Sequence, residues 1–155
     1  MNLPEHDMDR RLLSYAGRIV KLVECLPSTL AGTHVAGQLL RAGTAPLSTH
    51  GGLRAAESKD DLVRMLRSCW KDLQESRRWL QFVKHLSLVQ AAGEVELLAT
   101  EAESLIWIFA ASIWTARSKS ELRWQLRRPS PRPPRPVSSR VWAKAKHAVR
   151  RFCFC

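Results

Sequence analysis

The chain has 155 residues and a mass of 17.6 kDa, with 25 Lys and Arg against 14 Asp and Glu, so its formal net charge is +11. Its content of 45% apolar and 25% charged residues is typical of a globular protein and excludes a largely disordered chain. The longest apolar stretch spans only residues 105–116, and no secretory signal opens the sequence. We therefore expect no membrane span and a cytoplasmic location.

The positive charge is concentrated at the C-terminal end. Residues 127–155 contain basic residues but no acidic one, whereas residues 1–126 are close to neutral. This asymmetry predicts a folded body over 1–126 and a cationic tail over 127–155.

The first predicted helix covers about Asp9 to Leu26, because its apolar residues recur at spacings of three and four. Pro27 ends this helix. The second predicted helix covers about Ala31 to Ala56, although Gly43 and Pro46 disfavour it. Pro46 either kinks that helix or splits it in two, and we predict a kinked helix.

The third predicted helix begins at Ser58, which forms a capping pattern with Asp61. Apolar or small residues then recur at spacings of four and three, which predicts a long buried seam. The seam consists of Leu62, Leu66, Cys69, Leu73, Ser76, Leu80 and Val83.

The fourth predicted helix begins near Gly93 and reaches at least Ala116. Beyond residue 104 it is apolar on nearly every side, so three partner helices would not cover it. We therefore predict self-association, with Trp107, Trp114 and Phe109 at the contact between subunits.

The tail contains the proline-rich stretch PSPRPPRP at 129–136, which predicts a stiff linker. After it, a short basic amphipathic helix is expected from Ser138 or Ser139 to about Phe152. The linker also fits a polyproline docking ligand, but a spacer is the simpler interpretation.

The four cysteines have no spacing that binds a metal, and the five histidines are scattered. We expect Cys25 and Cys69 to be small core residues. His50 beside Ser48 and Thr49 has no carboxylate nearby in sequence to orient it. The sequence thus predicts no catalytic residue, no metal site and no cofactor.

Four sequence blocks carry a resemblance to a known family. They are QLLRAGT at 38–44, AESKDDL at 56–62, LQESRRWL at 73–80 and IFAASIWTA at 108–116. In this order they resemble the bacterial four-helix-bundle proteins encoded in intervening sequences of 23S rRNA genes. Accessory proteins of diversity-generating retroelements are similar to the same family.

The resemblance covers about residues 12–119 and implies an all-α, up-down four-helix bundle that assembles into a ring, commonly a pentamer. It also implies RNA or a reverse transcriptase as partner, through basic surfaces. The chain departs from the family where an N-Y-x-E-A run is usual, because it has Thr49, His50, Gly51, Gly52 and Leu53 there. The basic tail is a second departure.

Two groups of basic residues are candidates for binding phosphates. On the third helix and in the tail they are Arg64, Arg67, Lys71, Arg78, Arg127, Arg128, Arg140, Lys144 and Arg151. The alternatives are a merely solvated helix face, a tail with no ligand, and a tail on an anionic membrane surface. The leading hypothesis is a non-enzymatic oligomer that binds RNA or a ribonucleoprotein, and the alternative is a protein scaffold without a nucleic-acid ligand.

Overall fold

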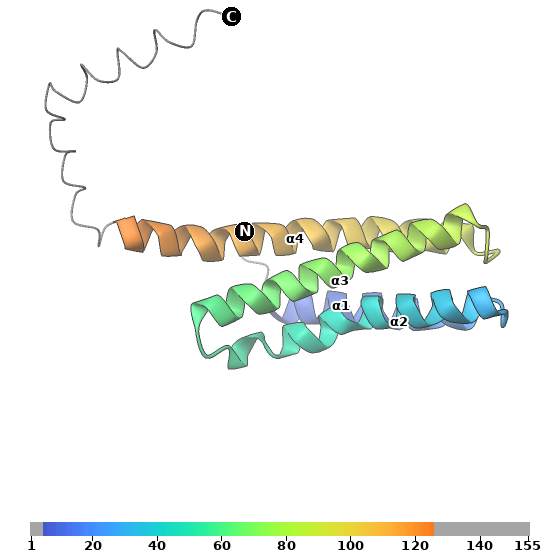
Figure 1. Cartoon of the computed structure of the whole chain (residues 1–155), viewed down its shortest axis with the longest axis horizontal. Coiled ribbons are helices and arrows are strands. Elements are labelled where there is room, and N and C mark those ends of the chain that lie inside the picture. Colours follow the sequence, from blue (N-terminus) through green and yellow to red (C-terminus); the bar gives the residue numbers. More distant parts are fainter. Residues whose placement is uncertain (1–4, 126–155) are drawn as a thin grey trace, which may run out of the picture. The chain divides into compact units, whose positions relative to one another are not determined.

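A computed structural model describes residues 5–125 of the chain, and the side chains of 7–118. Its helices are α1 (Glu5–Glu24), α2 (Leu30–Gly51), α3 (Lys59–His85) and α4 (Ala92–Gln125), with a short 3-10 turn η1 (Leu53–Ala55). Consecutive helices run in opposite directions, so the described part is an up-down bundle (Figure 1). The predicted all-α fold is confirmed. The predicted tail elements lie outside the described residues.

The core follows the periodicity of the sequence. On α3, the predicted seam is buried from Leu66 to Val83, and only Leu62 remains half-buried. Ser58 caps α3, since its hydroxyl accepts a 3.1 Å hydrogen bond from the amide of Asp61. The cap and the seam together fix where α3 begins and which face it buries.

The second helix is continuous through Pro46 and is not split there. It ends at Gly51, five residues before the predicted end at Ala56, and η1 follows it. Pro46 is fully buried, and the packing around it offsets the missing backbone hydrogen bond. Gly43 allows close approach to α1, because a Cβ there would lie 2.8 Å from Ile19 Cγ2.

The two described cysteines differ in their surroundings. Cys69 is buried as predicted, and its thiol donates a long 3.8 Å hydrogen bond to the carbonyl of Pro46. Burial raises the pKa of Cys69 to about 12, which keeps the thiol protonated and unreactive. The prediction that Cys25 lies in the core is wrong. Cys25 is exposed and lies just beyond the end of α1 at Glu24.

The fourth helix buries one stripe, formed by Leu98, Ala102, Leu105 and Phe109. By length and composition alone, its stretch Ala92–Ser118 could cross a membrane, with a mean hydropathy of 1.3. The expectation of no membrane span was based only on uninterrupted apolar residues. It therefore did not take this longer stretch into account. A mostly buried core helix would have the same composition, but only 22% of the apolar window is buried in the described bundle, on the stripe that packs into it.

Candidate nucleic-acid interface

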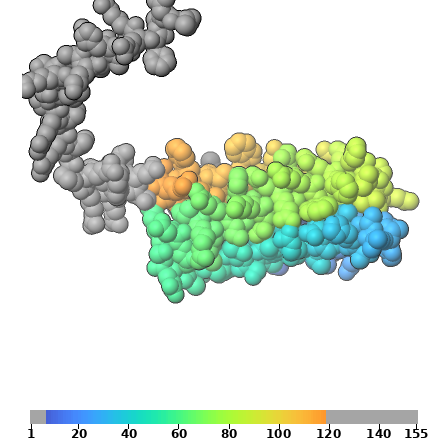
Figure 2. Space-filling view, viewed as in Figure 1, coloured from blue at the N-terminus to red at the C-terminus, as the bar shows by residue number. Residues whose placement is uncertain are grey.

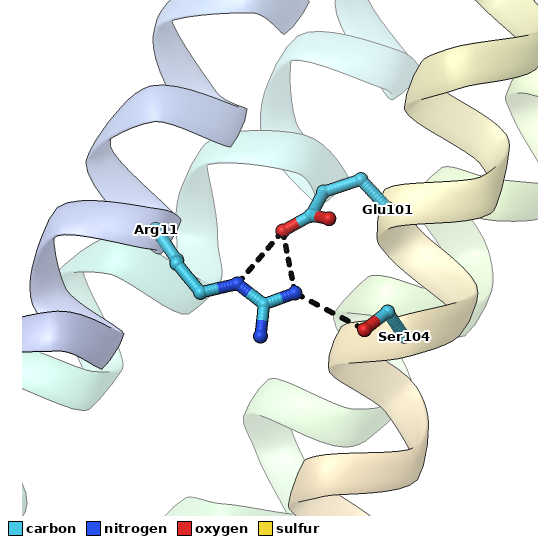
Figure 3. Close-up of polar contacts among 3 residues, drawn as sticks. All are labelled: Arg11, Glu101 and Ser104. Carbon is cyan, nitrogen blue, oxygen red and sulfur yellow. Dashed lines mark hydrogen bonds and ion pairs between the residues drawn. The ribbon is translucent and has the colours of Figure 1, made fainter. Parts of the chain in front are cut away.

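Ion pairs attach the first half of α4 to the helices on both sides. Arg11 of α1 donates two hydrogen bonds to Glu101, of 2.8 and 3.0 Å, and one of 3.1 Å to Ser104 (Figure 3). Arg18 of α1 bonds to Glu94 at 2.7 Å, and this contact lowers the pKa of the Glu94 carboxyl.

The side of α4 that faces α3 carries two further ion pairs. Glu103 lies 3.3 Å from Arg77, and Glu96 pairs with Lys84. All four acidic residues in this half of α4 thus have a basic partner within the bundle.

The middle of α4, between Glu103 and Glu121, has no such partners to offer. Between Glu103 and Glu121 the sequence contains no acidic residue, and between Asp61 and Asp72 of α3 it contains none either. Where these two segments lie side by side, neither segment offers a carboxylate to the basic side chains of the other. The distribution of acids along α3 and α4 therefore leaves positive charge uncompensated at one place in the bundle.

A groove of about 560 Å³ occupies that place, between the first turns of α3 and the part of α4 around Ala116 and Arg117. Figure 2 shows these segments adjoining, in green and orange. Five basic residues and one acidic residue, Asp60, line the groove together with Val63, Ser68 and Ala116. The basic residues are Lys59, Arg64, Arg67, Lys71 and Arg117.

The charge of the groove is largely unpaired. Arg64 pairs with Asp61 on its own helix. Within residues 7–118, whose side chains are described, no carboxylate forms an ion pair with Lys59, Arg67, Lys71 or Arg117. Such a cluster of free cations attracts anions, and guanidinium groups bind phosphate oxygens through two parallel hydrogen bonds.

The structure brings together three of the four basic residues predicted on the third helix. Arg64, Arg67 and Lys71 line the groove, whereas Arg78 is exposed further along α3 and does not. Lys59 and Arg117 also line the groove and were not predicted. The five candidate residues of the tail, Arg127, Arg128, Arg140, Lys144 and Arg151, lie outside the described residues.

A second cavity, of about 390 Å³, adjoins the groove. Arg67 and Lys71 line both spaces, and the second one is completed by Trp70, Ala110 and Ile113. Trp70 is half-buried and packs against the core. The two central cations therefore stand between a charged space and an apolar one.

The three predicted contact residues of α4 separate into two environments. Trp107 and Trp114 are 70% and 74% exposed, which leaves two large apolar side chains on the outer face of the bundle. Phe109 is only 2% exposed and belongs to the core of the single chain, where its ring meets the ring of His50 edge to face.

His50 has a carboxylate partner that the sequence did not reveal. Its Nδ1 lies 2.6 Å from Oδ1 of Asp9, so the pair joins the last turn of α2 to α1. No hydroxyl or thiol in the described part of the chain forms a hydrogen bond with the ring. Nor do three metal-binding side chains come together in the part of the chain that the structure describes. The pair of His50 and Asp9 therefore links α2 to α1.

Comparison with known proteins finds the same fold among solved structures. No family model and no curated protein matches the chain. A crystal structure of a protein of unknown function from the S23 ribosomal protein family of Bacteroides thetaiotaomicron matches with a TM-score of 0.64. The chain shares the fold of that protein. The match covers 72% of this chain and 98% of the other, at 20% sequence identity.

Proposed function

We propose that the chain is a non-enzymatic RNA-binding protein that holds phosphates in the groove between α3 and α4. The observation that carries this proposal is the cluster of unpaired cations there, above all Arg67 and Lys71. Because RNA carries one negative charge per nucleotide, a row of free cations gains by releasing the counterions of its backbone. The basic tail adds nine further cations to the same kind of contact.

The fold comparison supports membership of the S23 ribosomal protein family, and we include this family in the proposal. The name of the family points towards a ribosomal or ribonucleoprotein setting, which agrees with an RNA partner. The resemblance of the sequence blocks to proteins encoded within 23S rRNA genes points in the same direction. A reverse transcriptase, as in the retroelement accessory proteins, is a narrower version of this partner.

The test is fluorescence anisotropy with a labelled RNA hairpin at about 100 mM salt, where phosphate contacts still contribute strongly. The double variant Arg67→Gln/Lys71→Gln should weaken binding about tenfold or more, since it removes two charge-assisted contacts. Deletion of 127–155 should weaken binding further and leave the helical content of the bundle intact.

A charge-matched control removes two cations elsewhere. Arg10 and Lys21 are exposed on α1, which does not line the groove. Arg10→Gln/Lys21→Gln should bind RNA nearly as the unchanged chain does. Arg78→Gln, on α3 but outside the groove, should weaken RNA binding less than the double variant Arg67→Gln/Lys71→Gln does. Equal losses in the groove and control variants would contradict a defined binding site.

A second candidate function is a protein scaffold, and the exposed tryptophans favour it. Trp107 and Trp114 are seven residues apart on α4, so they lie on one face of the helix, where a second chain could cover them. We propose that this face joins copies of the chain into a closed assembly, with a pentameric ring as the specific form. A scaffold without RNA would assemble in this way but show no shift of the hairpin even at low salt.

A further inference from the structure

We infer that the RNA bound in the groove presents an unpaired nucleotide, whose base enters the apolar cavity beside Trp70. This inference rests on the proposed function, because it names the kind of RNA that the groove would take. It starts from the two adjoining spaces, of about 560 and 390 Å³, which share Arg67 and Lys71.

The chemistry changes from one space to the other. The groove presents cations from both helices, whereas the cavity is completed by Trp70, Ala110 and Ile113. A ligand that consisted only of phosphates would need only the cations of the groove and not the apolar cavity. The side chains of Trp70, Ala110 and Ile113 present an apolar surface beside the cations, and a flat, largely apolar group gains by covering it.

A nucleotide combines these two properties. Its phosphate would lie against Arg67 and Lys71, which are one helical turn, or about 6 Å, apart along α3. Its base would lie against Trp70, and aromatic side chains bind bases of every sequence by stacking. In a duplex the bases are paired and stacked within the helix, so only an unpaired or bulged nucleotide can reach the cavity.

The charge arrangement favours this occupant over an apolar peptide. Arg67 and Lys71 have no ion-pair partner among the described residues, and an apolar helix seated on the cavity would bury them without one. A phosphate supplies the missing negative charge at the same place. The ligand must therefore be anionic at one end and apolar at the other.

The test compares three probes with equal numbers of phosphates in the same buffer. They are a short single-stranded oligouridylate, a tetrahydrofuran-phosphate strand that has no bases, and a blunt RNA duplex. We expect the oligouridylate to bind about fivefold or more tightly than either other probe, the lower end of the effect of one stacked base.

Two variants of the full chain locate the effect. Trp70→Leu keeps an apolar side chain but removes the ring, and Ala110→Leu fills the cavity from α4 without changing the core side of α3. Each should abolish the preference for oligouridylate and leave binding of the baseless strand unchanged. Phe82→Leu, which removes an exposed ring on α3 outside both spaces, is the matched control and should keep the preference.

The outcomes separate this inference from the proposed function. If all three probes bind equally, or the duplex binds best, or neither variant removes the preference, the inference is overturned. Weaker binding of all probes by Arg67→Gln/Lys71→Gln would still support the groove in those cases. If the unchanged chain binds none of the probes at low salt, both the proposed function and this inference fail.

Discussion

Tyr15 of α1 and Ser76 of α3 share a hydrogen bond of 2.7 Å between their hydroxyl groups, and both residues are buried. Among the described residues no buried side-chain polar atom lacks a partner, so this pair meets the general rule for polar groups in a core. It joins two helices through residues that are 61 positions apart in the sequence. Because a buried hydroxyl without its partner is costly, the pair also fixes how α1 and α3 are aligned.

The first prediction concerns the ionisation of Tyr15, which is the only tyrosine in the chain. Burial raises its pKa from 10.0 to about 12, since the phenolate would be poorly solvated in the core. In a spectrophotometric titration of the folded protein, tyrosinate should therefore not appear until about pH 12, or until the bundle unfolds.

The unfolded chain in urea is the control and should titrate near the ordinary value of 10.0. Since the folded pKa is the higher one, folding stability is unaffected below pH 10 and falls as the pH rises from there towards 12. A folded protein that forms tyrosinate near pH 10 with its helical circular dichroism intact would contradict this placement of Tyr15.

The second prediction concerns the ion pair between Glu94 and Arg18. The hydrogen bond from Arg18 lowers the pKa of the Glu94 carboxyl below its ordinary value of 4.5. A lowered folded pKa stabilises the protein above the ordinary value, and this contribution is lost as the pH falls through the folded value. At pH 7, Glu94→Gln should therefore lower the free energy of unfolding by less than about 1 kcal/mol, which would appear as a modest decrease in Tm.

The difference in Tm between Glu94→Gln and the unchanged protein should shrink as the pH is lowered from 7 through 4.5 and below. Glu57→Gln is the control, because Glu57 is exposed and its carboxylate has no ion pair among the described residues. A difference that stays constant with pH would show that Glu94 contributes by packing and not by charge.

The third prediction concerns the close approach of α1 and α2 at Gly43. A Cβ at this position would lie 2.8 and 2.9 Å from two carbons of Ile19, which is itself fully buried. Gly43→Ala should therefore destabilise the protein by about 1–3 kcal/mol, measured by denaturant unfolding.

Gly37 provides the matched control on the same helix. A Cβ there would meet nothing within 4 Å, so Gly37→Ala should stabilise the protein by about 0.5–1 kcal/mol through the better helix propensity of alanine. If both substitutions had the same sign, the contact between Gly43 and Ile19 would not be as tight as described.

The fourth prediction concerns self-association through the outer face of α4. Trp107→Ser/Trp114→Ser should convert the sedimenting species from an assembly to a single chain at micromolar concentration, without loss of helical content. Leu13 and Leu30 are 61% and 92% exposed on other helices, and Leu13→Ser/Leu30→Ser should leave the assembly intact. An unchanged protein that sediments as a single chain would refute the assembly.

Much of the fold could be predicted from local pattern. The seam of α3 and its Ser58 cap depend on side chains within the helix itself, so periodicity was sufficient to place them. The end of α2 was not predictable in this way. Pro46 disfavours a helix locally, and only the tertiary packing around it, including Cys69, explains why the helix continues to Gly51.

The site was predicted in part for a related reason. Arg64, Arg67 and Lys71 share one face of a single helix, which sequence spacing reveals. Arg117 joins them only because α4 returns antiparallel to α3. The sequence of one helix alone does not show how it aligns with another. One sequence feature could have indicated the α4 side of the groove. It is the absence of acidic residues between Glu103 and Glu121, opposite a helix that carries unpaired cations.

The salt dependence of RNA binding tests the central claim most directly. The slope of log affinity against log salt counts the phosphates that cations neutralise, at about 0.7 per contact for a single strand. Arg67→Gln/Lys71→Gln should reduce the magnitude of this slope by about 1.4, whereas Arg10→Gln/Lys21→Gln should leave it unchanged. A slope that is the same in all three proteins would contradict phosphate binding in the groove.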